Sequence, residues 1–285
     1  MSVAMPIAFS SWAALLNNFV VERAGFTGVE IGILQSLREV PGFLAFTTVF
    51  VLLILREQTF AVLALALLGI GVALAGFFPS AIGLYLTTVL MSTGFHYFEV
   101  LKQSLALQWY DKADAPQALG KLISVGAITS LIVYALLWVL LTLFSLDYVW
   151  IFLLAGSACC GLAAFMWVGF PRVDAEIEQT HTLVLKKRYW LFYALQFLSG
   201  ARRQIFMVFA AFLMVEKFGY SAAQVTTLFL INYAFNWLFA ERIGSLIGRI
   251  GERKALTIEY TGLVIVFTAY AFVENPYVGA ALYVI

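Results

Sequence analysis

The residues of this chain that could do chemistry are a few charged side chains set inside long apolar runs. The clearest cluster lies in "GFHYFEVLKQS", where His96, Glu99 and Lys102 recur at every third position. Residues three apart lie on neighbouring faces of a helix. A carboxyl group in an apolar run can hold a proton near neutral pH, so Glu99 could carry a coupling proton and His96 could contact a solute. The simpler alternative is that Glu99 and Lys102 only neutralise each other.

A second pair of charges lies in "LSGARRQIF", where Arg202 and Arg203 are adjacent near the middle of an apolar run. Neighbouring residues project about 100° apart on a helix, so both cannot squarely face one cavity. One guanidinium could bind an anionic solute through two parallel hydrogen bonds, and the other could pair with a carboxylate. Alternatively, both arginines are structural and bridge to Glu39 or Glu99.

Two further runs contain polar side chains. In "SLREVPGF", Arg38 and Glu39 form either a self-compensating pair or, through Glu39, a second proton carrier, and Pro41 should weaken the helix there. Asn232 and Asn236 lie one helical turn apart in a later run, where they could hydrogen-bond a solute or join neighbouring helices.

The first run adds three residues that we hold as weaker candidates. Asn17 and Asn18 lie near its outer end, and Trp12 lies nearer its middle.

The composition indicates the class of protein that positions these residues. Of 285 residues, 63% are hydrophobic and 12% are charged, and the mean hydropathy is +0.94. A soluble domain has about half its residues apolar and about a quarter charged, so this chain belongs in a lipid bilayer. A net charge of +1 argues against nucleic-acid binding. His96 and His181 are the only histidines, and Cys159 and Cys160 are adjacent packing residues, so we expect neither a metal site nor a cofactor.

The apolar runs are long enough to form membrane helices, which need about 20 residues to cross a bilayer core. The first run lacks a basic start and an obvious cleavage site, so we interpret it as a membrane segment rather than a signal peptide. The sequence stops inside the last run, which indicates a fragment. The runs lie near 3–21, 28–55, 59–79, 81–108, 121–144, 148–170, 189–214, 223–247 and 255–273, and a tenth begins near Pro276.

The stretch 171–188, "PRVDAEIEQTHTLVLKKR", separates six runs from the rest and is predicted to be a linker. Basic residues favour the cytoplasmic side of a membrane protein. Connections on the linker's side hold ten of them and the opposite connections hold two, which predicts a cytoplasmic amino terminus and linker. The ten are Arg56, Lys112, Lys121, Arg172, Lys186, Lys187, Arg188, Arg249, Arg253 and Lys254, against Arg23 and Lys217.

A short internal sequence repeat indicates that the chain has two related halves. "VERAGFTGVEI" starts at Val21 and "VEKFGYSAAQV" starts at Val215, so the offset is 194 residues. Both lie after the first helix of a six-helix unit, as a parallel repeat would place them. Each contains a capping-box pattern of Thr or Ser followed three residues later by Glu or Gln. These residues are Thr27 and Glu30, and Ser221 and Gln224.

The stretch "GSLIGRIGERKAL" resembles the cytoplasmic loop motif of the major facilitator superfamily, G-x-L-x-D-R-x-G-R-R. The matching residues are Gly244, Leu246, Arg249, Gly251 and Arg253. The resemblance implies that this stretch is a structural and gating loop. Gly248 stands where the family has an acid and Glu252 where it has a base, so the resemblance gives no basis for the family's gating salt bridge here. The first-half equivalent, 50–60, has largely lost the pattern.

The resemblance implies an all-α polytopic membrane protein, a pseudo-two-fold pair of six-helix bundles with the second bundle truncated. The first bundle would be 1–170, the linker 171–188, and the incomplete second bundle 189–285. A complete family member has twelve spans, so the last two to three would be missing. In the family, the first, fourth, seventh and tenth helices commonly line the cavity.

The function implied by this resemblance is secondary transport rather than catalysis. We expect a small organic solute, with an anion and proton coupling as the favoured version, moved across a bacterial-type inner membrane. Proton-antiport efflux and uptake share these features. A non-transporting scaffold or sensor on the same fold remains an alternative, as does an intramembrane enzyme using His96 and Glu99 as acid and base.

Overall fold

The computed structural model describes residues 2–109, 115–169 and 186–284, and within these ranges the chain forms helices and no strand. Some helical side chains, including those of 201–208 and 241–249, lie outside the described set. The helices are α1 (Ala4–Ala24), α2 (Gly28–Phe43), η1 (Leu44–Thr47), α3 (Thr48–Val51), α4 (Glu57–Ala75), α5 (Ala81–Trp109), α6 (Ala115–Thr142), α7 (Tyr148–Gly169), η2 (Lys187–Tyr189), α8 (Trp190–Glu216), α9 (Ala222–Ile250), α10 (Glu252–Phe272) and α11 (Pro276–Val284).

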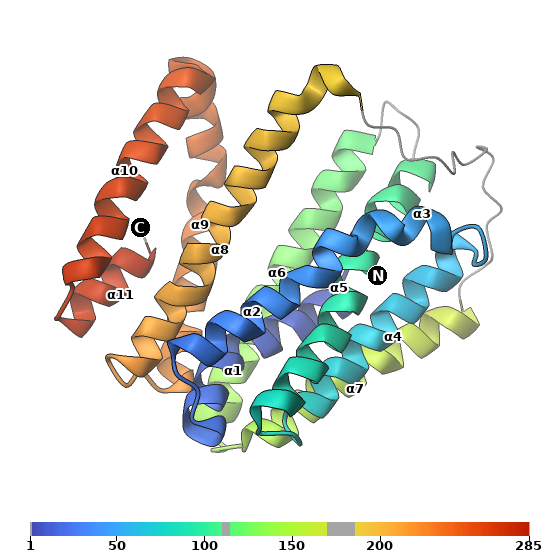
Figure 1. The fold of residues 1–285 in the computed structure, drawn as a ribbon, viewed down its shortest axis with the longest axis horizontal. Helices are drawn as coiled ribbons and strands as arrows, with labels where there is room; N and C mark the ends of the chain where they lie inside the picture. Colours follow the sequence, from blue (N-terminus) through green and yellow to red (C-terminus); the bar gives the residue numbers. More distant parts are fainter. Residues whose placement is uncertain (1, 110–114, 170–185, 285) are drawn as a thin grey trace.

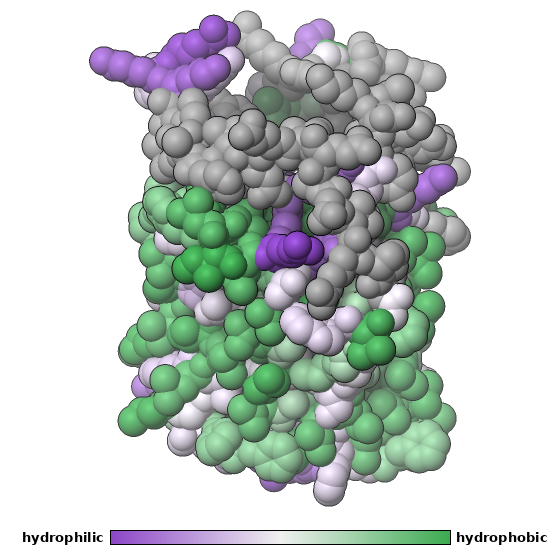
Figure 2. All heavy atoms as spheres, turned by 90° about the vertical axis from the view of Figure 1, so that its right-hand side faces the viewer, coloured by the Kyte–Doolittle hydropathy of each residue, from purple (hydrophilic) through white to green (hydrophobic). Residues whose placement is uncertain are grey.

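Each predicted apolar run forms a helix, which confirms the all-α polytopic fold (Figure 1). Five described helices are long and apolar enough to cross a membrane by composition alone: α1, α4, α7 and most of α6 and α10. The other long helices, α5, α8 and α9, contain the charged and amide residues discussed above, which lower their hydropathy. In Figure 2, hydrophobic side chains cover most of the lower part of the face shown, and several hydrophilic ones lie toward its upper end.

The predicted run at 28–55 is not one continuous α-helix. The α-helix of α2 ends at Phe43, two residues after Pro41, and the chain continues as the 3-10 turn η1 and the short helix α3. Proline lacks the amide hydrogen that would bond one turn back, and its ring crowds the preceding turn. The weakening expected at Pro41 is therefore visible as a change of helix type just beyond it.

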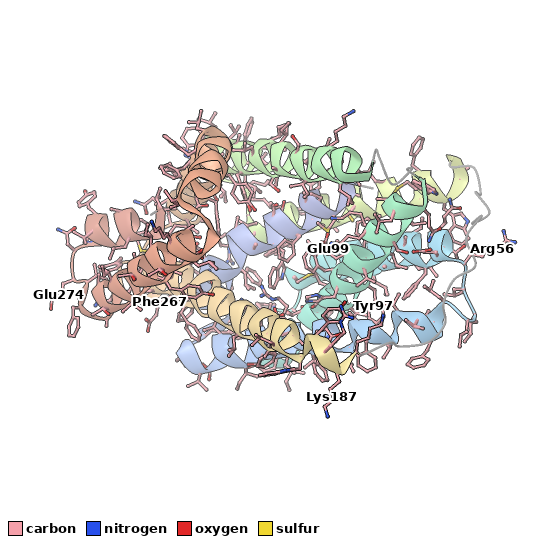
Figure 3. The ribbon with its side chains drawn as sticks, turned by 90° about the horizontal axis from the view of Figure 1, so that it is seen from above. Arg56, Tyr97, Glu99, Lys187, Phe267 and Glu274 are labelled. Atoms are coloured by element: carbon pink, nitrogen blue, oxygen red, sulfur yellow. The ribbon has the colours of Figure 1, made fainter. Side chains whose placement is uncertain are left out.

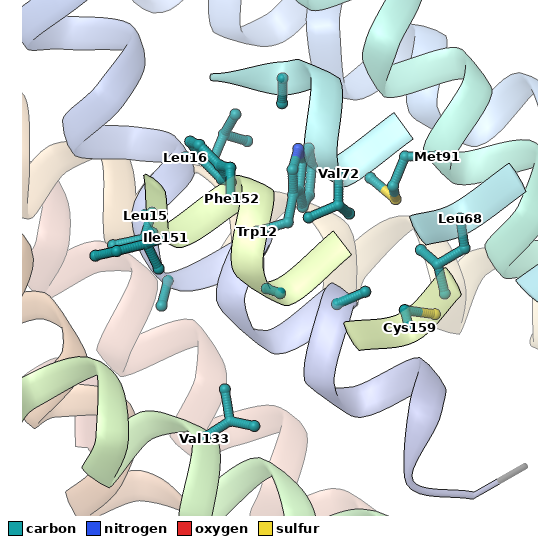
Figure 4. Close-up of a cluster of buried hydrophobic side chains, with 14 of the residues drawn as sticks. Trp12, Leu15, Leu16, Leu68, Val72, Met91, Val133, Ile151, Phe152 and Cys159 are labelled. Carbon is teal, nitrogen blue, oxygen red and sulfur yellow. The ribbon is translucent and has the colours of Figure 1, made fainter. Parts of the chain in front are cut away.

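The first six spans pack around a core that α1 shares with α4, α5 and α7 (Figure 4). Trp12 and Phe19 of α1 are almost fully buried, as are Phe152 of α7 and Met91 of α5. Phe19 meets Phe152 edge-on, with 5.3 Å between ring centroids. This core holds α1 firmly against its neighbours.

Glycines let α4 approach α5 and α7 at backbone distance. A Cβ on Gly94 of α5 would collide with the backbone of α4 at Leu68, and one on Gly156 of α7 would collide with α4 at Ala73. Small residues at such contacts are typical of membrane helix packing. Cys159 is buried beside this contact and is a free thiol, consistent with the packing role expected for it.

The repeat suggested by the sequence is visible in the geometry. The helices α2 and α9, α4 and α10, and α5 and α11 begin 194 to 195 residues apart, at Gly28 and Ala222, Glu57 and Glu252, and Ala81 and Pro276. Gly25 and Gly219, which end α1 and α8, have φ of 63° and 66°. Both glycines are left-handed, as helix-ending glycines often are.

Figure 1 shows two groups of helices, one from α1 to α7 and one from α8 to α11. They touch where α6 and α1 pack on α9 and where α1 packs on α8. Following the predicted orientation, we call the end formed by the connections 25–27, 76–80, 143–147, 217–221 and 273–275 the outer end, and the opposite one the inner end. In Figures 1 and 3, α6 and α9 lie together at the outer end and diverge toward the inner end.

Most of the predicted linker at 171–188 lies outside the described residues. The division of the chain at 170 and 189 therefore stays a proposal.

Candidate functional site

The helices α2 and α5 position the predicted charges of the first group. They run side by side, and the hydroxyl of Ser92 in α5 donates to the carbonyl oxygen of Arg38 in α2. One turn further on, a Cβ added to Gly42 would lie 2.8 Å from Cε1 of His96. The imidazole ring therefore packs directly on the backbone of Gly42, and the register of the two helices brings His96 beside the charged pair of α2.

Arg38 and Glu39 form the pair that their adjacency suggested. The guanidinium donates to Oε1 of Glu39 from Nε at 3.0 Å and from a terminal nitrogen at 2.7 Å. The Arg38 side chain is 14% exposed and that of Glu39 is 41% exposed. The guanidinium carbon also lies 6.0 Å from the ring centroid of Trp12 in α1, within the range of a cation–π contact. Arg38 is thus held by groups from two helices.

Glu99 and Lys102 also form an ion pair, between the Lys102 ammonium and a Glu99 carboxylate oxygen. Both side chains are partly buried. Glu99 lies about 4.5 Å nearer the inner end than His96, from a rise of about 1.5 Å per residue. In Figure 3, Glu99 and Tyr97 lie inside the outline of the molecule, whereas Arg56, Lys187 and Glu274 point outward from its edge.

His96 lies near both pairs, and we treat the five residues as one cluster. Its ring packs on Gly42, three residues after Glu39 on α2, and it precedes Glu99 by three residues on α5. With neutral histidine, the formal charges of the cluster sum to zero, because two cations face two carboxylates. The structure places Arg38, Glu39, His96, Glu99 and Lys102 on two helices that pack side by side, and their roles in transport stay predictions.

In the second group, Asn232 and Tyr233 of α9 lie where this helix meets α11 and α6. The Asn232 amide donates to the carbonyl oxygen of Tyr283 at 3.5 Å, which joins α9 to α11. Tyr134 of α6 stacks on Phe229 with 5.3 Å between centroids, and it meets Tyr233 edge-on at 5.2 Å. The bond from Asn232 joins α9 to α11, and the predicted role of this residue in solute binding stays a prediction.

Several predicted residues lie outside the described set. The side chains of Arg202 and Arg203 in α8, Asn236 and Arg249 in α9, and Arg253 in α10 are among them, and Gly244 also lies in the undescribed part of α9. Their roles stay predictions.

Gly251 is described, and it is the single residue between α9 and α10. Its φ of 83° favours glycine, so this position of the loop motif matches its local geometry.

Three contacts were missed from the sequence. Trp12 lies beneath Arg38, and the hydroxyls of Thr47 and Tyr97 lie 2.5 Å apart, between η1 and α5. Gln108 donates to the buried Glu57 at the start of α4. A lone aromatic or glutamine in an apolar run gives no signal of such contacts, because the partners are separated by many residues. Among the described residues, no cluster of His, Cys, Asp or Glu could hold a metal ion.

Comparison with known families gives a single assignment. The profile of the Major Facilitator Superfamily matches residues 1–285. The chain belongs to this superfamily. The resemblance of the 244–256 loop is thereby confirmed at the level of the family, and membership points to a secondary transporter embedded in the bilayer rather than to an enzyme.

Solved structures agree with membership of the superfamily. A D323A mutant of the nucleoside transporter NupG matches with a TM-score of 0.77 and 17% identity, covering 99% of this chain and 75% of that one. A bacterial homologue of the human lysosomal transporter Spinster, inward-facing and unoccupied, matches with a TM-score of 0.61 and 14% identity, covering 99% and 69%. At these identities the likeness shows the fold alone. A search of the curated proteins found no match.

Proposed function

We propose that this superfamily member is a proton-coupled carrier of a small organic anion, which works by alternating access in a bacterial-type inner membrane with its amino terminus inside. The observation that supports it is the cluster of Arg38, Glu39, His96, Glu99 and Lys102 within the first group of helices. Ionisable groups at membrane depth are costly, and they mark solute or proton pathways far more often than they serve packing.

Proton coupling is assigned to the two carboxylates. Glu99 and Glu39 each have a cation within hydrogen-bonding distance, so each can lose its proton without leaving an isolated charge. Each could also take a proton if its cation turned toward a solute. A solute anion that competes for Arg38 or Lys102 would free the carboxylate to be protonated. This exchange is a direct way to couple the two fluxes.

Anion selectivity is assigned to Arg202 or Arg203. The cluster in α2 and α5 is neutral overall, so net attraction for an anion has to come from elsewhere. Both arginines lie in α8, which packs on α1. A guanidinium can bind a carboxylate or phosphate through two hydrogen bonds. Asn232 and Asn236 of α9 would supply neutral hydrogen bonds to the same solute.

The test is solute-driven proton flux. The protein is reconstituted in liposomes that contain a pH-sensitive dye, and panels of organic anions, zwitterions, sugars, cationic drugs and nucleosides are added. Nucleosides belong in the panel because one structural neighbour is a nucleoside transporter.

We expect a proton flux with anions alone. Glu99→Gln should abolish this flux, and so should either Arg202→Gln or Arg203→Gln. Labelled-solute exchange that is indifferent to the pH gradient and to Glu99→Gln would contradict proton coupling. No exchange of any solute by a correctly folded protein would favour the scaffold alternative.

A further inference from the structure

Among the described residues at the outer end, one polar side chain joins the two groups of helices by a hydrogen bond. Asn18 of α1 is 1% exposed, and its Nδ2 donates to the backbone carbonyl oxygen of Tyr220 at 2.7 Å. The two residues are 202 positions apart, and Tyr220 lies in the connection between α8 and α9. This hydrogen bond therefore crosses from the first group to the second, at the end where α1 packs on α8.

The acceptor is held in place by its own group. The amide of Tyr220 donates to the carbonyl of Met214 at 3.0 Å, next to the left-handed Gly219, so the cap of α8 fixes the backbone here. The Tyr220 hydroxyl donates to the carbonyl of Pro276 at the start of α11, also at 3.0 Å. The carbonyl that receives Asn18 is therefore anchored to both α8 and α11.

The donor, Asn18, is also held in place by contacts within its own group of helices. One turn after Asn18, Glu22 accepts a hydrogen bond from the Asn18 amide at 3.4 Å and another from the Tyr148 hydroxyl at 2.9 Å. The next residue, Arg23, forms an ion pair with Asp147. These contacts join the end of α1 to the beginning of α7. The bond between Asn18 and Tyr220 thus connects two braced units rather than two loose loops.

The repeat makes this contact one-sided. At the offset of 194 residues, the counterpart of Asn18 is Phe212 and the counterpart of Tyr220 is Phe26. Both phenylalanines are buried and belong to the apolar core. The pseudo-symmetric position therefore offers no hydrogen-bond donor, and the polar closure of the outer end depends on Asn18.

We propose that Asn18 is the clasp that keeps the outer end of this carrier closed while the inner ends lie apart. The proposal rests on transport by alternating access as proposed above, and it names a residue that positions the two groups rather than one that binds the solute. The clasp is reversible. The Asn18 carbonyl oxygen is buried and has no hydrogen-bond partner among the described residues. An unpaired buried acceptor opposes the closed state, so opening relieves part of the cost of breaking the bond.

The test measures the outer end directly. Spin labels on cysteines introduced at Phe78, in the connection 76–80, and at Tyr277, in the first turn of α11, report the distance between the groups by pulsed electron resonance. Both positions are exposed. Asn18→Leu removes the donor, and Asn18→Asp preserves the shape while placing a carboxylate against the Tyr220 carbonyl. We expect the share of the longer, open distance to rise about fivefold in Asn18→Leu, from the loss of one hydrogen bond, and further in Asn18→Asp.

The matched control is Asn17→Leu. It removes a neighbouring buried amide for which no hydrogen bond to the second group is described, so the distances should stay as in the parent protein. Unchanged distances in both Asn18 variants, or equal opening in the Asn17 variant, would overturn the clasp. Longer distances between the spin labels in the Asn18 variants, in a protein that moves no solute, would support the role of Asn18 and contradict the proposed transport. The two proposals therefore fail in different ways.

Discussion

The second spans of the two repeats, α2 with η1 and α3 in one and α9 in the other, begin alike and then diverge. Both start with a capping box, in which the Thr27 amide donates to Glu30 at 2.9 Å and the Ser221 amide donates to Gln224 at 2.8 Å. Further along, α2 changes helix type after Pro41, whereas α9 remains an α-helix to Ile250.

The interiors differ in charge as well as in shape. At the offset of 194, Arg38 and Glu39 correspond to Asn232 and Tyr233. The first pair forms a salt bridge beside His96, whereas Asn232 bonds to a backbone carbonyl. The comparison teaches that the first turns of α2 and α9 share a capping box, whereas the residues in the interiors of the two helices differ in charge and in contacts. In this pair of spans, we assign ion chemistry to α2 and neutral hydrogen bonding to α9.

The largest expected effect comes from making α2 resemble α9. Arg38→Asn removes the hydrogen bonds to Glu39 and the contact with Trp12. Hydrogen bonds to charged groups are worth about 1.5–3 kcal/mol, so we expect the initial transport rate to fall at least about tenfold. Asn232→Ala should lower it less than about threefold, since it removes one long, neutral bond.

A double-mutant cycle makes the same prediction sharper. Arg38→Gln combined with Glu39→Gln should lower the initial transport rate by less than the two single changes together, because the double variant leaves no unpaired charge. Strict additivity would show that the pair does not act as a unit.

The next effect concerns the contact between α2 and the histidine. Gly42→Ala places a Cβ 2.8 Å from the His96 ring, which must move. We expect a loss of about 1–3 kcal/mol in unfolding free energy, as for overpacked cores, with a several-fold lower transport rate. Gly32→Ala is the control on the same helix, because its Cβ would meet nothing within 4 Å. Equal effects of the two changes on thermal unfolding would argue against the His96 contact.

A smaller effect is expected at the glycines that precede the two spans. Gly25→Ala and Gly219→Ala each force a Cβ into a left-handed conformation, at a cost of about 1–2 kcal/mol. Neither Cβ would meet another atom within 4 Å, so the cost is conformational and should be equal. Unequal shifts in thermal unfolding would show that the two turns are less alike than their geometry indicates.

The smallest effect is expected at the caps. Thr27→Ala and Ser221→Ala each remove a hydrogen bond to the first turn of the following helix and should cost about 1 kcal/mol. Thermal unfolding of the two variants measures this, with Thr261→Ala as a control at an exposed hydroxyl that bonds only one turn back in its own helix. A loss confined to one of the two caps would contradict a shared role in the repeat.

Much of the fold could be predicted because it follows from local patterns. The lengths of the apolar runs predicted the helices, and Thr27 with Glu30 indicated the start of one of them. The motif at Gly244 to Arg253 pointed to the superfamily. Pro41 predicted a weak point, but its outcome, a 3-10 turn that begins three residues later at Leu44 and packs against α5, could not be predicted from the local sequence.

The site was harder to predict, because its contacts join distant parts of the chain. The spacing of Glu99 and Lys102 indicated their pair, and adjacency indicated that of Arg38 and Glu39. The placement of His96 on Gly42 depends on the register between two helices, which no local pattern specifies. Asn18 looked like a minor polar residue near a helix end, and its importance appears only when Tyr220 is seen beside it.

The single-residue connection at Gly251 has a practical consequence. Consecutive Cα atoms are about 3.8 Å apart, so a connection of one residue keeps the end of α9 and the start of α10 together. An epitope tag or protease site inserted there would unwind a helix end. Insertions for mapping the topology belong instead in the five-residue outer connection at 76–80, which lies apart from the contacts of Asn18 and Tyr220.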